Sequence, residues 1–147
     1  MVTTPTRFEL KETTDYAAMR QLALDSGLED GNYSDFVKAY GFFEGVTLVA
    51  CAGLKSQRGV FSLECVAVKE GLRGAGLGSR LIRILEEEAM GRGADRIWAL
   101  ARAPGFFEKV GYKRTADGVP DGPNLAACKT CRQFHKNCNP SIVLKVF

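Results

Sequence analysis

The segment between Val66 and Ala89 constrains the fold of this chain more than any other. A β-rich run ends at Val68, and an arginine and three glycines at alternate positions then lead into an amphipathic helix. Backbone that approaches a ligand closely and presents several N–H groups in a row is expected at Gly74, Gly76 and Gly78. The N-terminus of the helix adds unpaired donors and a partial positive charge. The segment therefore predicts a strand–loop–helix unit with a site for a phosphate or pyrophosphate.

Three kinds of glycine-rich phosphate loop can be compared with this segment. A Walker loop requires a lysine where the helix starts, but this helix starts with Gly-Ser-Arg. A dinucleotide-binding loop has its first glycine directly after the strand, whereas five residues separate Val68 from Gly74 here. The acid that such a loop needs about 20 residues further on is also absent from Ile97–Ala101. The remaining pattern, Arg-x-x-Gly-x-Gly, is matched by Arg73, Gly76 and Gly78. On its own it could equally be a turn that merely starts a helix.

The surroundings of this loop resemble the GNAT family of N-acetyltransferases, whose acyl-CoA pyrophosphate loop has the same Arg-x-x-Gly-x-Gly pattern. The likeness continues through residues 103–112, where an aromatic pair is followed four residues later by Gly-Tyr. It covers roughly residues 6–115 in element order. The resemblance implies an α/β fold with a GNAT-like mixed, mostly antiparallel central sheet flanked by helices.

Length and composition agree with a single N-acetyltransferase domain over residues 1–147. Apolar residues make up 46% of the chain and charged residues 25%, which is typical of a globular protein. The net charge of +3 includes no basic block, so charge gives no indication of nucleic-acid binding. No apolar run approaches the length of a membrane span, and the polar start does not resemble a signal peptide. We therefore expect a cytoplasmic protein that binds neither membranes nor nucleic acid.

Hydrophobic periodicity and turn signals predict the order of the elements. Strands are expected at residues 7–11, 42–43, 46–54, 60–68, 96–101, 112–115 and 142–147. Helices are expected at 16–26, capped by Thr13 or Thr14, after the glycine loop as far as Gly91 or Gly93, and at 104–110, with a short helical candidate at 35–40. The long helix is expected to bury Leu77, Leu81, Ile84, Leu85 and Ala89, and to leave outside Arg80, Arg83, Glu86 and Glu87.

The chemistry that the resemblance implies is acetyl transfer from acetyl-CoA, as co-substrate, to an amine. In such enzymes the strand before the loop, here Val66, Ala67 and Val68, holds the pantetheine arm, and one of its N–H groups polarises the thioester carbonyl. The pyrophosphate would then be held by Arg73, Gly74, Ala75, Gly76, Leu77, Gly78 and Ser79. Phe107, the second residue of the aromatic pair, completes the expected cofactor-binding set.

A base is needed because an amine acceptor is largely protonated at neutral pH. Many family members have a carboxylate two residues before the pantetheine-binding segment, which makes Glu64 the candidate catalytic residue. Its alternative role is a cross-strand ion pair. Phe107 stands where the family often has a tyrosine that protonates the leaving thiolate, and Leu100 stands in place of a common asparagine. Either a thiolate leaves without such help, or Tyr112 or Tyr33 substitutes, unless both tyrosines pack in the core.

Three of the five cysteines and the only histidine lie close together near the C-terminus. These residues, Cys128, Cys131, His135 and Cys138, could bind a structural zinc ion, form a disulfide or remain free thiols. The cramped spacing of the second pair argues against zinc, and we predict no metal ligand. Cys51 and Cys65 lie in apolar strands and are expected to be core residues.

The cysteine loop also resembles that of the short acetylglutamate-synthase-like branch and of related acetyltransferases found with arsenic-resistance genes. That resemblance implies a glutamate-like acceptor, whose carboxylate Lys113, Arg114, Lys129 or Arg132 could bind unless they are surface charges. We predict an N-acetyltransferase acting on the amino group of a small molecule, with a homodimer left open. The alternatives are a catalytically impaired acyl-CoA-binding regulatory domain, suggested by Phe107 and Leu100, and a protein or peptide N-acetyltransferase.

Overall fold

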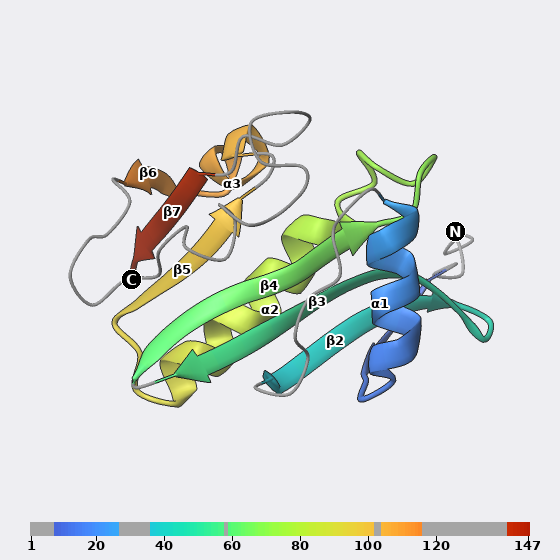
Figure 1. Cartoon of the computed structure of the whole chain (residues 1–147), viewed down its shortest axis with the longest axis horizontal. Coiled ribbons are helices and arrows are strands. Elements are labelled where there is room, and N and C mark those ends of the chain that lie inside the picture. The colour runs from blue at the N-terminus through green and yellow to red at the C-terminus, as the bar shows by residue number, and fades with distance from the viewer. Residues whose placement is uncertain (1–7, 27–35, 58, 102–103, 116–140) are drawn as a thin grey trace, which may run out of the picture.

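A seven-stranded sheet forms the centre of the molecule (Figure 1). The computed structural model describes residues 8–26, 36–57, 59–101, 104–115 and 141–147. The elements follow one another as β1 (Glu9–Glu12), α1 (Tyr16–Asp25), β2 (Phe36–Glu44), β3 (Thr47–Gln57), β4 (Val60–Val68), α2 (Leu77–Gly91), β5 (Arg96–Ala101), α3 (Pro104–Lys109), β6 (Lys113–Thr115) and β7 (Ser141–Val146).

The strands lie in the order β1-β2-β3-β4-β5-β7-β6. Every neighbouring pair is antiparallel except β4 and β5, which run parallel at the centre of the sheet. This arrangement confirms the predicted mixed, mostly antiparallel sheet. It also puts β4 next to β5 at the centre of the sheet, with the glycine loop following the end of β4.

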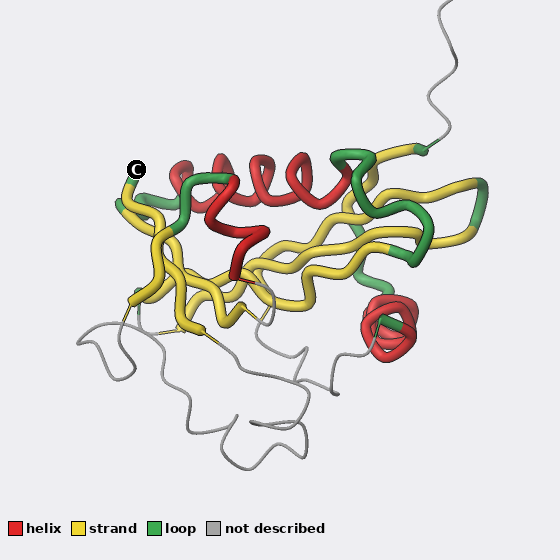
Figure 2. The backbone as a smooth tube through the Cα atoms, turned by 90° about the horizontal axis from the view of Figure 1, so that it is seen from above, coloured by secondary structure: helices red, strands yellow, loops and turns green. Residues whose placement is uncertain are grey.

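Helices α1 and α2 cover opposite faces of the sheet, as Figure 2 shows in a view along it. On the α2 face, apolar residues of the helix such as Leu81 and Leu85 pack against Leu54 and Leu63 of the strands. On the α1 face, Met19 and Leu22 pack with Cys51 and Ala67. Burial of apolar surface on both faces supplies the main driving force for folding. Among the described residues, no helix is both long and apolar enough to cross a membrane.

Most predicted boundaries agree with the structure to within two residues, but the expected cap of α1 was wrong. The Asp15 side chain caps the helix by accepting a hydrogen bond from the backbone N–H of Ala18 at 3.1 Å. Thr13 supports this cap from outside the helix, because its hydroxyl oxygen accepts a hydrogen bond from the Asp15 N–H.

The short helix expected at residues 35–40 was also wrong, because the part from Phe36 onward is the first half of β2. The register between β2 and β3 shifts between Phe36 and Lys38. Such a shift breaks the strict alternation of apolar and polar residues that identifies a strand in sequence. Pairing with β3 therefore decides the conformation here, over the local pattern.

Helix α2 buries the predicted Leu77, Leu81, Leu85 and Ala89, whereas Ile84, expected with them, is only half-buried. The helix also buries Ile82 and Glu86. The expectation that Glu86 lies outside was wrong: it is only 7% exposed. Its carboxylate accepts a hydrogen bond from the Tyr112 hydroxyl at 2.7 Å and pairs with the Lys145 ammonium at 3.1 Å. Burial removes the Glu86 carboxylate from water, and its two partners compensate for the contacts that it loses.

Candidate active site

Strands β4 and β5 separate soon after they meet. They pair only at Ser62 with Trp98 and at Leu63 with Ala99. Beyond this point, the backbone edge of β4 that faces β5 has no strand partner among the described residues. The unpaired stretch includes Val66, Ala67 and Val68, the residues predicted to hold the pantetheine arm. The backbone groups that point outward from this edge are thus open to a ligand that lies between the strands, except for the Val68 carbonyl, which accepts a hydrogen bond from Arg73.

A β-bulge lies just before this stretch. Between the pairs Gly53–Glu64 and Cys51–Ala67, β4 advances three residues while β3 advances two, so one residue of β4 is extra. Cys65 lies in the bulge with φ +56°, the only positive φ of a non-glycine residue in the described ranges. Backbone strain of this kind is often found at functional sites.

The bulge decides which way Glu64 faces. In a regular strand, Glu64 and Ala67 would face opposite sides because successive side chains alternate. The extra residue puts both on the α1 face, where Ala67 packs with Met19. Glu64 lies at the point where β4 and β5 diverge, and its side chain is 36% exposed. The candidate base therefore lies beside the opening in the sheet and remains accessible.

The Glu64 carboxylate also has the ion-pair partner that the alternative interpretation anticipated. Its Oε2 lies 3.0 Å from the ammonium nitrogen of Lys55 on β3. Lys55, which the sequence analysis did not single out, is a buried residue directly after an apolar run of β3 that ends at Leu54. That unusual setting is the one signal in the sequence that could have drawn attention to it.

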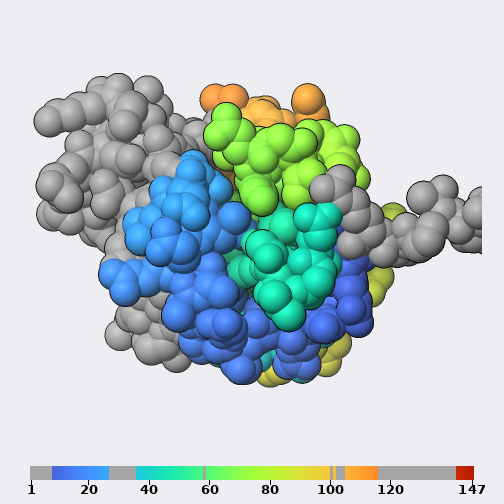
Figure 3. Space-filling model, turned by 90° about the vertical axis from the view of Figure 1, so that its right-hand side faces the viewer, coloured from blue at the N-terminus to red at the C-terminus, as the bar shows by residue number. Residues whose placement is uncertain are grey.

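The glycine loop folds as the sequence predicts. Gly74 and Gly76 adopt φ values of +90° and +80°, which only glycine adopts without strain. Gly76 is the N-cap residue of α2 and offers no side-chain hydrogen bond to the first turn. In the described structure the N–H groups of Gly76, Leu77, Gly78 and Ser79 have no hydrogen-bond acceptor, and the first helical bond runs from the Arg80 N–H to the Gly76 carbonyl. Figure 3 shows this loop in yellow-green on the surface, above the teal turn between β2 and β3.

Three elements converge at Gly78. A Cβ atom on this residue would lie 3.0 Å from the Phe106 ring of α3 and 3.5 Å from the Val68 side chain of β4. A Cβ here would be tight against the Phe106 ring and in ordinary contact with Val68, so glycine at this position favours the close approach of α2 to α3. Arg73 lies at the same corner, with its Nε donating to the Val68 carbonyl at 3.4 Å. The open edge of β4 thus leads directly into the loop with free N–H groups.

The aromatic pair of α3 divides between the site and the core. Phe106, a residue that the sequence analysis did not assign, contacts the Gly78 region. Phe107 is buried and packs edge-on against Phe106 and Tyr112 at centroid distances of 5.4 Å. The aromatic pair was recognisable in the sequence, but which of its rings faces α2 depends on the orientation of α3.

Tyr112 is held in the core. It is 2% exposed, and its hydroxyl donates to Glu86. Burial, reinforced by the neighbouring Glu86 carboxylate, raises the pKa of Tyr112 well above its usual range. The prediction that Tyr112 could pack in the core is therefore confirmed, and a buried hydroxyl with this partner is a poor proton donor to a leaving thiolate. Tyr33, the other tyrosine considered as a proton donor, lies outside the described residues.

The remaining predicted contacts are only partly described. Arg114 forms hydrogen bonds with Glu108 at the surface, and Lys113 is exposed. The other proposed acceptor contacts, Lys129 and Arg132, and the cysteine–histidine cluster at 128–138 lie outside the described residues. Within the described ranges, no group of side chains suited to a metal ion is found.

Comparison with known proteins identifies the family. The model of the acetyltransferase (GNAT) family matches residues 3–112, well over half of the chain. The chain belongs to this family of acyl-CoA-dependent N-acetyltransferases, which use acetyl-CoA as co-substrate. This confirms the family, the fold class and the class of enzyme predicted from the loop.

Solved structures share the same fold. N-acetylglutamate synthase from Neisseria gonorrhoeae, complexed with coenzyme A and N-acetyl-glutamate, superposes with a TM-score of 0.70 at 18% identity. The match covers 97% of this chain but 36% of that enzyme, so the chain spans about a third of its length. Rv2747 from Mycobacterium tuberculosis, in complex with CoA, matches with a TM-score of 0.71 at 18% identity over 95% of this chain and 99% of that one.

A third similar structure is the ribosomal-protein-S18-alanine N-acetyltransferase from Escherichia coli. It matches with a TM-score of 0.67 at 16% identity, over 95% of this chain and 93% of that one. At such identities the likeness shows the shared fold and leaves the acceptor of this chain to be argued from its own residues.

Proposed function

We propose that this protein transfers the acetyl group of acetyl-CoA to the amino group of a small molecule, with a glutamate-like amino acid as the first acceptor to test. The observation that carries the proposal is the separation of β4 from β5 beside the glycine loop, with Glu64 at the point of divergence. A thioester between the strands, a pyrophosphate at the loop and an amine near Glu64 would then meet at one place. Holding both substrates in this way supplies much of the rate acceleration by proximity.

The backbone of β4 and the loop would bind the co-substrate. Unpaired groups of Val66–Val68 are suited to the amide groups of the pantetheine arm, and one N–H directed at the thioester carbonyl would stabilise the developing oxyanion by about 3 kcal/mol. The free N–H groups of Gly76–Ser79, at a helix N-terminus, are suited to the pyrophosphate. A Cβ on Gly76 would meet nothing within 4 Å, so the loop leaves room for this close approach.

A groove continues from the loop along α2. It has a volume of about 310 Å³ and is lined by residues that include Ser79, Arg80, Arg83 and Lys145. Two of these, Arg80 and Arg83, are on the same helix whose N-terminus would bind the pyrophosphate. Their guanidinium groups are suited to a further phosphate. The nucleotide end of CoA would lie here.

Glu64 would act as the base. It would take a proton from the acceptor amine as the nitrogen attacks the thioester carbon, and the C–S bond would then break to release the CoA thiolate. Phe107 has no hydroxyl to protonate this thiolate, and Tyr112 is engaged in the core. A thiol of pKa about 8.5 leaves readily enough that no protein acid is required.

Two alternative functions have to be distinguished from this proposal: a regulatory domain and a peptide acetyltransferase. The absence of a hydroxyl at Phe107 favours, as the second candidate, an acyl-CoA-binding regulatory domain with impaired catalysis. Acetyl-CoA turnover with a panel of amino acids, polyamines and peptides, measured by thiol release, separates the candidates. Turnover with glutamate-like acids supports the proposal. Acetyl-CoA binding without turnover of any amine supports the regulatory domain, and turnover of peptides alone supports a peptide acetyltransferase.

The pH dependence of a Glu64→Gln variant tests the role of Glu64. Removal of a general base lowers kcat/KM at pH 7 by about a hundredfold or more. The deficit should narrow as the pH rises, because a larger fraction of the acceptor amine is then already deprotonated. Glu87→Gln, which changes an exposed glutamate on α2, is the matched control. A Glu64→Gln variant with the parent's pH–rate profile would contradict the assignment.

Three broader expectations stay predictions: a single domain over residues 1–147, a cytoplasmic location, and the absence of nucleic-acid and membrane partners. Whether the protein forms a homodimer stays open. The mild net charge of +3 supports the expectation about nucleic acid.

A further inference from the structure

Lys55 occupies an unusual place for a lysine. It lies on β3 and is 6% exposed, with buried apolar residues such as Leu54 before it on the same strand. Removing an ammonium group from water is costly unless a counter-charge and further contacts compensate. Lysine is among the residues that are rarely buried without such a partner. We therefore expect a counter-charge and further contacts around the Lys55 ammonium.

Two groups hold the ammonium of Lys55. The carboxylate of Glu64 lies 3.0 Å away, and the ring of Phe36 lies beneath it with its centroid at 5.2 Å. Phe36 is directly opposite Lys55 in the register of β2 and β3. A ring in this position attracts a cation electrostatically and also limits where the lysine side chain can lie.

The lack of a side chain at Gly53 leaves room for the Phe36 ring. A Cβ atom on Gly53 would lie 2.8 to 3.0 Å from atoms of the Phe36 ring, so only glycine leaves room for the ring there. Gly53 is also the residue of β3 that pairs with Glu64. On the other side, the Phe36 ring packs edge-on against Tyr16 of α1 at a centroid distance of 5.7 Å.

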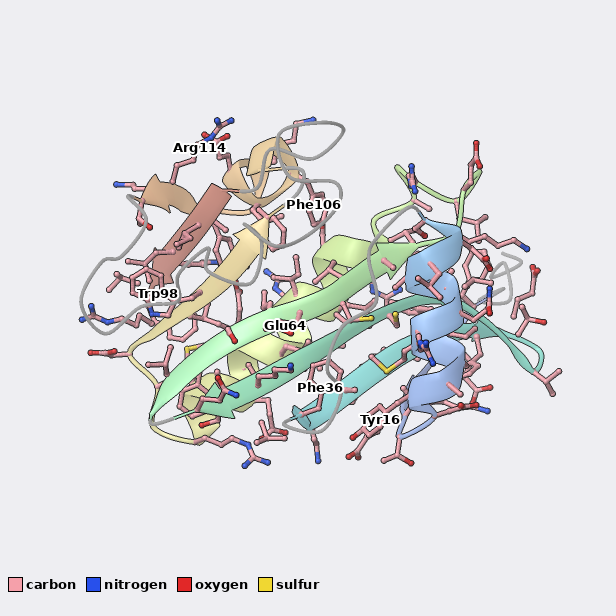
Figure 4. All side chains as sticks on the ribbon, in the orientation of Figure 1. Tyr16, Phe36, Glu64, Trp98, Phe106 and Arg114 are labelled. Atoms are coloured by element: carbon pink, nitrogen blue, oxygen red, sulfur yellow. The ribbon has the colours of Figure 1, made fainter. Side chains whose placement is uncertain are left out.

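These contacts form a continuous series across four elements, from α1 through β2 and β3 to β4. Figure 4 shows Tyr16, Phe36 and Glu64 following one another across this face of the sheet. The series ends at Oε2 of Glu64, which faces the Lys55 ammonium. The second carboxylate oxygen of Glu64 remains for the acceptor, on a side chain that is 36% exposed.

We propose that Lys55 is a positioning residue for Glu64: with Phe36 beneath it, its ammonium holds one carboxylate oxygen so that the other is aimed at the acceptor amine. This inference rests on the proposed function of Glu64 as the base. In the reaction the amine proton passes to Glu64, the N–C bond forms and the C–S bond breaks. Lys55 takes no part in this proton transfer.

A double-mutant cycle tests whether Lys55 acts through Glu64. Lys55→Met should lower kcat about tenfold while the KM for acetyl-CoA stays unchanged, because the loop and the β4 edge are untouched. In the Glu64→Gln background the same substitution should have no further effect on kcat, since the carboxylate that Lys55 orients is gone. Lys55→Arg, which keeps the charge, should recover part of the loss.

Two further variants separate positioning from stability. Lys38→Met removes a β2 lysine that pairs with Glu12 at 3.1 Å on the other side of the sheet, and it should leave kcat unchanged. Gly53→Ala should displace the Phe36 ring and, like Lys55→Met, lower kcat, although it removes no charge. Thermal melting of each variant shows whether kcat simply follows stability.

The outcomes distinguish the two proposals. If Glu64→Gln lowers kcat and Lys55→Met does not, or if Lys55→Met has the same effect with and without the Glu64 carboxylate, the positioning role is wrong and the base remains. If Glu64→Gln leaves kcat unchanged, the role of Glu64 is wrong and that of Lys55 with it. If the wild-type protein acetylates no amine, the proposed function fails and this inference with it.

Discussion

Substitution of Gly76 by valine tests the pyrophosphate site most directly, because the chain contains a matched control. Gly76 has φ +80° and Gly59, in the turn between β3 and β4, has φ +78°. A Cβ on either residue would meet nothing within 4 Å. Gly76→Val, at the N-cap of α2, and Gly59→Val, just before β4, therefore introduce the same backbone strain without a clash in either case.

The expected magnitudes follow from these two facts. An L-residue in the left-handed region costs about 2 kcal/mol, which lowers the Tm of a domain of this size by roughly 4–8 °C in both variants. At Gly76 the valine side chain would additionally keep the pyrophosphate away from the N–H groups at the start of α2. Loss of one hydrogen bond to a charged group costs about 1.5–3 kcal/mol, which raises the Kd for CoA by roughly ten- to a hundredfold.

Isothermal titration calorimetry of CoA binding and thermal melting of the free proteins measure both quantities. We expect equal losses of Tm in the two variants and weaker CoA binding in Gly76→Val alone. If Gly76→Val binds CoA as tightly as Gly59→Val does, the loop does not bind the pyrophosphate. If both variants lose affinity equally, the loss reflects general destabilisation, and the reasoning from local geometry is refuted.

Two further predictions concern the core and the cysteine loop. Because the raised pKa of Tyr112 keeps its hydroxyl protonated in the folded state, its contribution to stability is complete below about pH 10, where the unfolded chain also keeps the proton, and is lost as the pH rises further. The difference in unfolding free energy between wild type and Tyr112→Phe, measured with urea, should therefore shrink by about 1.4 kcal/mol per pH unit above pH 10; a constant difference would contradict this. A chelator should leave the Tm unchanged, since no metal ligand is predicted, whereas a loss of Tm reproduced by Cys128→Ser and Cys131→Ser would reveal a bound metal ion.

The sequence predicted the parts of the site that depend on local backbone conformation. Gly74 and Gly76 are needed for positive φ, and the start of α2 follows from them within a few residues. Such information lies within a short window, because each position is constrained by its own backbone and its nearest neighbours. The family resemblance of this window then extended the prediction to the whole sheet.

What the sequence did not predict depends on residues far apart in the chain. Glu86 reads as a surface residue of an amphipathic helix until Tyr112 and Lys145, 26 and 59 residues later, are brought to it. The direction of Glu64 depends on a bulge whose presence is visible only in the pairing of β4 with β3. Lys55 was missed for the same reason, since nothing near it in sequence identifies its partner. Tertiary contacts decide these cases over local pattern.

The short parallel pairing of β4 and β5 has a consequence for how the molecule can deform. Between the described strands, two residue pairs alone join β1–β4 to β5–β7 directly. On the α2 face, Glu86 of the long helix forms a hydrogen bond with Tyr112 and an ion pair with Lys145, which belong to the part of the molecule that contains β5–β7. These contacts hold the two parts of the sheet together on the α2 face. Among the described residues, no hydrogen bond or ion pair links these two parts of the sheet on the α1 face, where Glu64 lies, so we expect any widening that admits a bulky acceptor on that face.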